Sequence, residues 1–323
     1  MAATRRGCPS TVEEWRKAVS SNWRALEAAP PELKANPEVM LAAMKRGWQA
    51  LEFAPKSLRG DRGFVLAAVA VNPQSWQGLE FVSPELAEDR EIVRAAMKQN
   101  GLALQFAPDP LRADRELLLE VVRDTEQGWR ALEFAAPDLQ SDMELLHVAV
   151  RSGWDGWKAL GFSSTALHDR DLILEAVSQN GRALQFADAK LRADKGIVSE
   201  AIKQSGWALH YATAELRADR ELVLNAVARC GAVLQFASPE LRADVEVVRA
   251  AIRQEWPALE FASADLRAKR ELVTEALALN GDALQFASAE LQADPALQEA
   301  ARLCTRPMRR TTLSPRPGSK GGS

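Results

Sequence analysis

Apolar positions along this chain follow a repeating unit of about 25 residues. Each unit has a short apolar block that ends in an aromatic residue and, after a polar turn, a longer segment with an apolar stripe. In the copy at 231–255 the short block contains Leu234 and Phe236. The stripe of its longer segment consists of Val247, Val248, Ala251 and Ile252. Apolar residues at i, i+1, i+4 and i+5 predict an amphipathic helix with a broad buried face.

One aromatic residue closes the short block of each unit, and we interpret these residues as structural anchors of the repeat. The ten anchors are Phe53, Phe81, Phe106, Phe134, Phe162, Phe186, Tyr211, Phe236, Phe261 and Phe286. From Phe186 onward they are 25 residues apart, and the earlier steps are 28, 25, 28, 28 and 24 residues. Ala28 follows Leu26-Glu27 as a degenerate first member, which gives eleven copies over residues 22–304.

A fixed period of this length is typical of a solenoid, in which each unit buries its apolar face only against its neighbours. The chain therefore predicts an all-α fold, an α-solenoid of about eleven short two-helix repeats. Because one unit has too little apolar surface to fold alone, we expect each aromatic ring and its Leu neighbours to fill the seam between successive units. Phe236→Ala would then cost about 3–5 kcal/mol, as deletion of a core aromatic does.

Start signals divide each unit into two helices joined by a bent connection. The run 238–240 (Ser-Pro-Glu) predicts a turn of helix with an N-cap, a proline at the first position and an acid in the first turn. An aspartate then precedes the longer helix, where its carboxylate can accept from free backbone N–H groups. These predicted N-caps are Asp61, Asp89, Asp114, Asp142, Asp194, Asp219, Asp244 and Asp294. Two other copies have Arg170 and Lys269 at this position.

The turn that follows each long helix contains glycines and insertions. Gly206, Gly231 and Gly281 are expected to end the long helix in a left-handed conformation. Three units carry extra residues in this turn, at 72–75, 124–127 and 152–155. Equivalent insertions in a solenoid lie at one edge, so these loops should project together, either as plain length variation or as a binding edge.

Composition is that of an ordinary globular protein, with 47% apolar and 26% charged residues. A formal charge of -3 gives no field that would draw the whole array to phosphate or to an anionic membrane. The N-terminal residues lack the apolar stretch of a secretory signal, and no later run reaches the length of a membrane span. We therefore expect an intracellular, cytoplasmic protein with no membrane contact, for which nucleic acid is not a favoured partner.

Three regions follow from the limits of the repeat. We expect an N-terminal segment and capping helix at 1–21, the helical repeat array at 22–304 and a disordered basic tail at 305–323. The tail is rich in Pro, Gly, Ser and Thr and contains no acidic residue. Arg309 to Thr312 and Ser314-Pro315 resemble kinase sites, but such short matches are also common in solvated tails.

Candidate catalytic chemistry is sparse. The three histidines occupy different positions of the repeat without a second ligand at a metal-binding interval: His147, His168 and His210. The three cysteines are far apart and outside any CxxC spacing: Cys8, Cys230 and Cys304. His168 and Asp169 could suggest a base and its orienting acid, but adjacent residues rarely face each other. We predict no catalytic, cofactor-binding or metal residue, and keep an enzyme with a dispersed site as a third possibility.

Tryptophan recurs five residues before the anchor, where other copies have glycine. These residues are Trp23, Trp48, Trp76, Trp129, Trp157 and Trp256. Five of these copies have Glu four residues after the Trp, a spacing at which an indole N–H on a helix could reach the carboxylate: Glu27, Glu52, Glu80, Glu133 and Glu260. Packing between units is one interpretation, and an exposed aromatic ladder that grips a peptide is the other.

Four arginines recur at 25-residue steps and are the candidate partner-binding residues: Arg192, Arg217, Arg242 and Arg267. On a solenoid they should form a row along one surface, extended less regularly by Lys34, Arg59 and Arg112. An acidic residue lies two positions before three of them, at Glu215, Glu240 and Asp265. The row is therefore either neutralised within the repeat or a docking stripe for acidic peptide segments.

The recurring phrase that begins at Asn280-Gly281, and similarly at Asn180-Gly181, joins a Leu-Gln-Phe-Ala block to a Leu-Arg/Gln-Ala-Asp block. This phrase resembles the tandem repeats of the domain of unknown function family DUF4116. The resemblance covers nearly the whole array and implies an all-helical repeat protein, without an activity, cofactor or catalytic residue to carry over. Ala28, Arg170, Lys269 and Gly161 depart from the phrase, so the first and middle units are expected to be capping or distorted copies.

The favoured function is a non-enzymatic scaffold that presents an extended helical surface to a protein or peptide. The alternative is a nucleic-acid-associated repeat protein that uses the arginine row and the basic tail. No cofactor is expected in either case.

Overall fold

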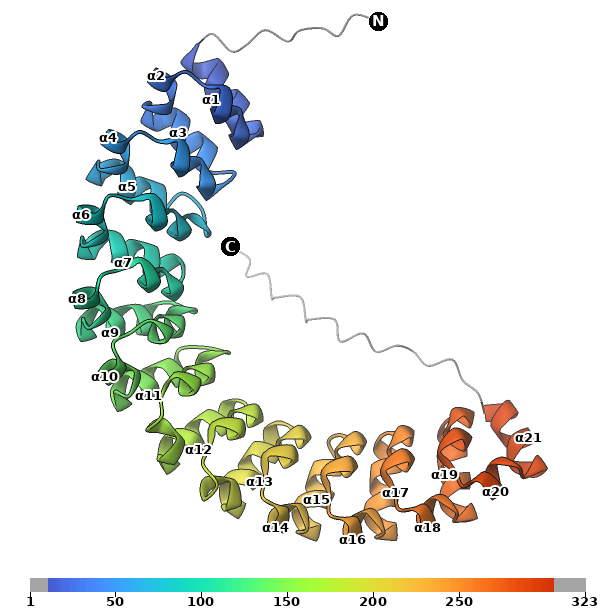
Figure 1. Ribbon diagram of the computed structural model, residues 1–323. Helices are drawn as coiled ribbons and strands as arrows, with labels where there is room; N and C mark the ends of the chain where they lie inside the picture. The colour runs from blue at the N-terminus through green and yellow to red at the C-terminus, as the bar shows by residue number, and fades with distance from the viewer. Residues whose placement is uncertain (1–10, 305–323) are drawn as a thin grey trace, which may run out of the picture. The chain divides into compact units, whose positions relative to one another are not determined.

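The computed structural model describes residues 11–304, which form two compact units, unit 1 up to residue 191 and unit 2 from residue 192 (Figure 1). Every regular element in these residues is an α-helix or a 3₁₀ helix. Each of the eleven repeats has the same order of segments: a 3₁₀ segment, a short helix of about one turn and a long helix. The all-α repeat architecture predicted from the sequence is confirmed.

Unit 1 begins with α1 (Val12–Ser21). Its 3₁₀ segments before each short helix are η1 (Trp23–Ala28), η2 (Trp48–Phe53), η3 (Ser75–Phe81), η4 (Gly101–Phe106), η5 (Gly128–Glu133), η6 (Gly156–Phe162) and η8 (Gly181–Phe186). The short helices are α2 (Pro31–Lys34), α4 (Lys56–Arg59), α6 (Pro84–Ala87), α8 (Asp109–Arg112), α10 (Pro137–Gln140) and the 3₁₀ turn η7 (Ala166–His168). The long helices are α3 (Pro37–Met44), α5 (Arg62–Val69), α7 (Arg90–Gln99), α9 (Arg115–Asp124), α11 (Met143–Arg151) and α12 (Arg170–Gln179).

Unit 2 continues the same pattern, after the short 3₁₀ turn η9 (Leu191–Ala193). Its other 3₁₀ segments are η10 (Gly206–Tyr211), η11 (Gly231–Phe236), η12 (Trp256–Phe261) and η13 (Gly281–Phe286). The short helices are α14 (Ala214–Arg217), α16 (Pro239–Arg242), α18 (Ala264–Arg267) and α20 (Ala289–Gln292). The long helices are α13 (Lys195–Gln204), α15 (Arg220–Val227), α17 (Val245–Gln254), α19 (Arg270–Leu279) and α21 (Pro295–Cys304).

Within each unit the repeats stack in chain order. Long helices of consecutive repeats contact one another, as α3, α5 and α7 do in unit 1 and α15, α17 and α19 do in unit 2. In Figure 1 the short helices α4, α6 and α8 follow one another along one edge of unit 1, and α14, α16 and α18 do so in unit 2. The predicted stripe of the long helix is its buried face: Val247, Val248, Ala251 and Ile252 are all inaccessible or nearly so.

The predicted first helix of each repeat is a 3₁₀ segment, and the bent connection contains a further turn of helix. In η11, Val233 and Ala237 donate to the carbonyls of Cys230 and Leu234, three residues earlier in each case. At three residues per turn, positions three apart lie on one face. Val233 and Leu234, which precede the anchor Phe236, are adjacent and therefore lie on different faces of the segment. Both are fully buried.

The short helices are held by backbone hydrogen bonds between repeats. The N–H of the residue before one short helix donates to the carbonyl of the last residue of the preceding one. Ser238 N donates to Arg217 O at 2.9 Å, and Ser263 N donates to Arg242 O at 2.9 Å. Since a helix of four residues leaves most of its backbone groups without an internal partner, this contact satisfies one group at each end.

The anchor rings differ from the prediction in their depth. All ten anchors are half-buried, whereas the Leu two residues before Phe236 and the Ala after it are buried. Rings from consecutive repeats contact each other instead, as Trp207 and Phe236 do at a centroid distance of 5.6 Å. The seam is therefore filled mainly by aliphatic side chains, and the rings cover its rim. The expected cost of 3–5 kcal/mol for Phe236→Ala, which assumed full burial, is too high for a half-buried ring.

The glycines serve a different purpose from the one predicted. Gly206, Gly231 and Gly281 do not have positive φ; Gly153 is the one described glycine that does, at 153°. A Cβ on Gly231 would lie 2.4 Å from the carbonyl oxygen of Ala251 in α17, and one on Gly281 would lie 2.0 Å from that of Ala301. Close approach of the 3₁₀ segment to the long helix of the same repeat, rather than a left-handed turn, excludes a side chain there.

Leu234 and Phe236 offer a direct test of which side chain supports the seam. Leu234→Ala should cost about 2–5 kcal/mol, because a fully buried Leu leaves a cavity. Phe236→Ala should cost less, about 1–3 kcal/mol, because its ring is half-buried. Urea unfolding followed by circular dichroism would measure both, and hydrogen exchange would show loosening first in the neighbouring repeats. Asn225→Ala, on the exposed side of α15, serves as the control, and an equal or reversed order for the first two variants would contradict this assignment.

Candidate functional site

Each predicted aspartate caps the long helix that follows it. The Asp244 carboxylate accepts from the backbone N–H groups of Glu246 and Val247 at 2.8 and 3.1 Å. Equivalent bonds to one or two N–H groups are present at Asp61, Asp89, Asp114, Asp142, Asp194, Asp219 and Asp294. The backbone at the seven caps that precede Asp294 is extended, as an N-cap requires. All eight aspartates therefore have the geometry predicted from the sequence.

The same aspartates join consecutive repeats through a basic residue that the sequence analysis did not single out. The first residue of one long helix, usually Arg, forms an ion pair with the cap Asp of the next repeat. The pairs with N–O distances of 2.6–2.9 Å are Arg62–Asp89, Arg90–Asp114, Arg115–Asp142, Lys195–Asp219 and Arg220–Asp244. Arg270 and Asp294 form a further pair of this kind. We call this set the cap ladder; its signal in the sequence is the recurring Asp-Arg-Glu.

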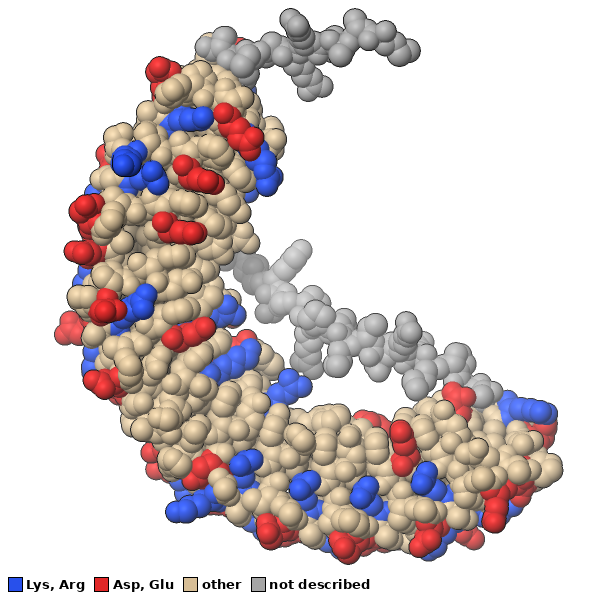
Figure 2. All heavy atoms as spheres, viewed as in Figure 1, with Lys and Arg blue, Asp and Glu red and all other residues tan. Residues whose placement is uncertain are grey.

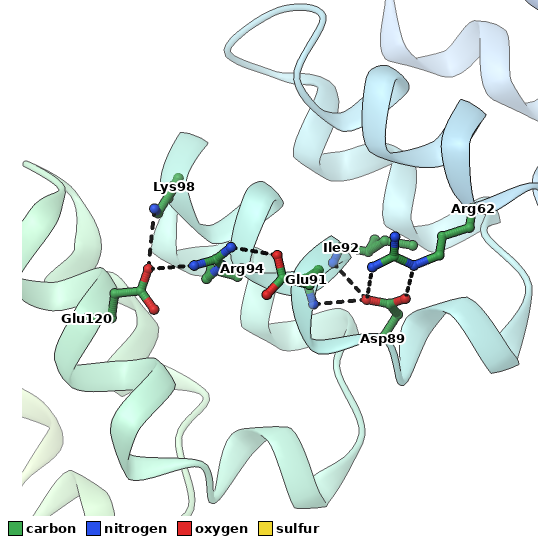
Figure 3. Close-up of polar contacts among 7 residues, drawn as sticks. All are labelled: Arg62, Asp89, Glu91, Ile92, Arg94, Lys98 and Glu120. Atoms are coloured by element: carbon green, nitrogen blue, oxygen red, sulfur yellow. Dashed lines mark hydrogen bonds and ion pairs between the residues drawn. The ribbon is translucent and has the colours of Figure 1, made fainter.

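A second set of ion pairs joins the middles of neighbouring long helices. In Figure 3, Arg94 on α7 donates to Glu120 on α9 at 3.0 Å and to Glu91 on its own helix at 2.5 Å. Lys98 reaches the same Glu120 at 3.3 Å. Arg249 and Glu275 form the corresponding contact in unit 2 at 2.9 Å. Many surface charges are thus committed to contacts between repeats, and basic and acidic side chains lie interspersed on the face shown in Figure 2.

The ion pairs of the cap ladder favour the charged form of the aspartates. Hydrogen bonding from Arg220 holds the pKa of Asp244 below its usual range, against the opposing effect of burial, and the N–H groups of Val247 and Glu246 act in the same direction. Arg62 lowers the pKa of Asp89 in the same way. Because these hydrogen bonds outweigh the effect of partial burial, both half-buried carboxylates are more stable as anions than free aspartate.

The register assigned to one copy was wrong. The residue that caps α12 is Asp169, whose carboxylate accepts from Leu172 N at 2.8 Å, and Arg170 is the first residue of the helix. The 24-residue step at this copy reflects a deletion just before the cap, which moved the aspartate by one position. Lys269 does occupy the cap position of α19, where a lysine side chain has no acceptor to offer.

The arginine row lies at the ends of the short helices of unit 2. Arg217, Arg242 and Arg267 are the last residues of α14, α16 and α18, and Arg192 lies in η9. All four are half-buried. Within residues 11–304 none of them has an ion pair, so neutralisation by the nearby acids is not observed. Their Nε atoms are buried without an acceptor, which leaves the terminal guanidinium nitrogens as the accessible part.

In several other copies the same position supports the 3₁₀ segment. Arg112 donates to the carbonyls of Gln105 and Ala107 at 2.7 and 2.8 Å. Lys34, Gln140 and Gln292 also donate to carbonyls at the C-terminal end of their own 3₁₀ segments. A side chain at this position therefore has a local capping role in those repeats, which Arg192, Arg217, Arg242 and Arg267 do not share.

The tryptophans pack between repeats. Each Trp contacts the anchor ring of the next repeat, with centroid distances of 5.8–6.3 Å for Trp23, Trp48, Trp76, Trp129, Trp157 and Trp256. All six are buried or half-buried, which favours packing over an exposed ladder. The five Glu residues four positions later are exposed. Because the segment is 3₁₀, a spacing of four places a Glu on a different face from the Trp, so the predicted Trp–Glu contact does not form.

The histidines contact residues of neighbouring repeats, and the two described cysteines are free thiols. His147 contacts Glu175 at 2.7 Å, and His168 contacts Asp188 of the next repeat at 2.8 Å while Asp169 caps α12. His210 lies against the ring of Phe236 at 4.5 Å. Cys230 and Cys304 are free thiols, and burial raises the pKa of Cys230, with Glu255 adding to the effect. Cys8 and the tail at 305–323 lie outside the described residues.

Two of the three insertion loops are neighbours at one edge of unit 1. Glu126, Gln127, Trp154 and Asp155 line a shared cavity of about 70 Å³ with residues of η5. Trp154 is 81% exposed. A cavity of this size holds a few water molecules at most, so the loops as a binding edge remain an untested prediction.

No metal-binding group of three or more His, Cys, Asp and Glu side chains occurs in the part of the chain that the structure covers. Across the same residues, all helices are too short or too polar to span a bilayer.

The fold and its inter-repeat contacts define an all-α protein of tandem helical repeats. Five segments match the family Domain of unknown function (DUF4116), at residues 36–87, 61–112, 89–140, 169–217 and 219–267. Together they cover more than half of the chain, and the chain belongs to this family. Every match starts at the cap residue of a long helix and covers about two repeats, so one family domain corresponds to two repeats. The comparisons with curated proteins and with solved structures found no match.

Asp244→Asn removes the ion pair with Arg220 but keeps a side chain that can cap the helix. Asn also caps helices well, so the variant should lose only the pairing with Arg220, about 0.2–1 kcal/mol at neutral pH. The pKa of Asp244 is lowered in the folded state, so its contribution is complete above the unfolded pKa and is lost as pH falls through the folded pKa. The stability difference between wild type and variant, measured by urea unfolding, should therefore shrink below about pH 4. A difference that stays constant down to acid pH would contradict this role.

Lys269→Asp tests the cap alone. The backbone at Lys269 (φ -82°, ψ 112°) matches that of the aspartate caps, such as Asp244 (φ -78°, ψ 118°). The preceding repeat has Val245 where the cap ladder needs a basic residue, so a new aspartate would gain no ion pair there. We expect stabilisation by about 0.5–2 kcal/mol from the cap. Lys269→Ala removes the lysine without adding an acceptor, and an equal gain from that control would exclude capping as the cause.

Proposed function

We propose that this protein is a non-enzymatic scaffold that binds an acidic protein or peptide segment along the short-helix edge of unit 2. The observation that supports it is the arginine row. Four guanidinium groups recur at 25-residue steps, without an ion pair in the described chain and with accessible terminal nitrogens. Most of the basic residues that begin the long helices are paired with a neighbouring repeat, whereas the row arginines, at the ends of the short helices, are not.

An extended acidic segment matches the chemistry of the row. A guanidinium group presents its N–H groups in a planar fork that fits a carboxylate, and a partly desolvated pair is stronger than a fully solvated one. Half-burial of each stem also lowers the side-chain entropy that pairing would cost, because the arginine is already held in place. Regular spacing along the repeats favours a segment with acidic residues at intervals over a single compact ligand.

The distribution of charge along the chain favours a short-range contact. Residues 1–10 and 305–323 contain seven of the 41 basic residues and none of the 44 acidic ones, which leaves 34 basic against 44 acidic residues in 11–304. An array with this excess of acids repels polyanions at long range. This argues against the nucleic-acid alternative for the array, and it makes local contacts with the arginine row responsible for recognition of an acidic segment.

Charge reversal in the row tests the proposal. Arg217→Glu combined with Arg242→Glu should weaken capture of acidic peptides by the intact protein at least about tenfold, since two favourable pairs become repulsive. Binding of a fluorescein-labelled peptide with glutamates at intervals, followed by anisotropy, measures the effect. Arg229 and Arg253 are exposed arginines of unit 2 outside the row, and reversal of both is the matched control. Binding that is unchanged by the row variant, or lowered equally by the control, would rule out the row as the docking surface.

A further inference from the structure

A groove of about 660 Å³ lies between the short helices α4 and α6 of unit 1. It is within the range of volumes found for ligand sites. One wall carries Lys56 and Arg59 of α4, and the floor is formed by residues of η3 and α6. Junctions between short helices recur along the array, but the residues of α4 make this one chemically different.

Helix α4 has an unusual excess of positive charge. Its sequence is Lys56-Ser57-Leu58-Arg59, where most copies have Pro or Ala at the first position and an acid at the second. No other copy has a basic residue at the position of Lys56. Three copies have an acid two positions before the arginine, as Glu240 lies before Arg242, and Ser57 stands at this position here. The groove therefore has two cationic side chains on one wall and no acid on the same helix.

Neither of these cations is neutralised by a protein carboxylate in the described chain. Lys56 is exposed, and no carboxylate lies within ion-pair distance of it or of Arg59 across residues 11–304. Arg59 donates to the backbone carbonyl of Phe81 at 3.3 Å, and its Nε atom is buried without an acceptor. The guanidinium is thus positioned at the groove by a neutral acceptor and keeps its capacity to bind an anion.

One acid, Glu85, also lines the groove. Glu85 lies in the first turn of α6, where its own backbone N–H and the Ser83 hydroxyl lower the pKa of its carboxylate. This carboxylate is therefore stabilised by the N-terminus of its own helix rather than by Lys56 or Arg59.

The floor of the groove supplies apolar contact. Phe81 and Leu86 are half-buried, and Val82 is 9% exposed. An apolar side chain resting on these residues would remove further apolar surface from water, and an adjacent carboxylate would reach the cationic wall.

We propose that the groove between α4 and α6 binds an acidic peptide segment in which an apolar side chain is flanked by carboxylates. Segments 1–10 and 305–323 contain no acidic residue, so neither supplies this ligand, and we assign the site to a segment of a partner protein. This site rests on the proposed function only in taking a peptide as the ligand, because its residues belong to unit 1 and do not include Arg192, Arg217, Arg242 or Arg267.

The test uses the intact protein and a short fluorescein-labelled peptide with leucine between glutamates, followed by fluorescence anisotropy. Lys56→Glu should weaken binding about three- to tenfold, since an attractive contact becomes repulsive. Ser57→Glu introduces the acid that several other copies have at this position and should weaken binding about two- to fivefold, because the added carboxylate repels an acidic peptide. Both positions are exposed, so neither variant should disturb folding. Lys45→Glu, an exposed lysine at the end of α3, makes the same change of charge away from the groove.

Peptide variants and the row variants define the remaining outcomes. Replacing the glutamates by glutamine, or the leucine by alanine, should each reduce affinity, because the wall and the floor recognise different parts of the ligand. Equal effects of Lys56→Glu and Lys45→Glu would overturn the proposal, as would tighter binding of a single-stranded oligonucleotide with the same sensitivity to Lys56. If the double variant Arg217→Glu, Arg242→Glu still binds the leucine-containing peptide, the groove acts independently of the arginine row. The proposals for the groove and for the row can therefore fail separately.

Discussion

No repeat in this protein can satisfy its own backbone or cover its own apolar face, and this constraint determines the rest of the structure. Segments of four to six helical residues leave most of their N–H and C=O groups without internal partners. The next repeat supplies what is missing: its N-cap N–H reaches the last carbonyl of the preceding short helix, as Ser238 does with Arg217. Helices too short to exist alone are stable because they are stacked.

The cap ladder extends this mutual dependence to charged groups. Asp244 caps its own helix and accepts from Arg220 of the preceding repeat, so one carboxylate serves a local and a long-range purpose. Charges used in this way are unavailable for partners. Unpaired cations at Arg217, Arg242 and Lys56 are therefore more informative than the overall composition, since they have no counterpart in the contacts that hold the repeats together.

Predictions from the sequence were correct where a local backbone requirement is met by one type of residue. Asp244 and its equivalents were identified as caps because an acceptor is needed wherever a helix begins. It failed where a spacing was interpreted with the wrong helical period. Trp129 and Glu133 appeared to share a face at 3.6 residues per turn, but η5 is a 3₁₀ segment with three. The pairing of Arg220 with Asp244 was missed because it joins residues 24 apart, although the recurring Asp-Arg-Glu could have suggested it.

The period, the all-helical class, the number of copies and most of the long-helix starts were determined by the sequence, because they depend on local patterning repeated many times. Only the tertiary structure decided the depth of each side chain. Phe236 looked like the centre of the core and lies at its rim, while Leu234 is fully buried. Gly231 is required by the approach of Ala251, twenty residues away, and not by its own backbone conformation. Such properties depend on which atoms of neighbouring segments meet, and a one-dimensional pattern does not contain that information.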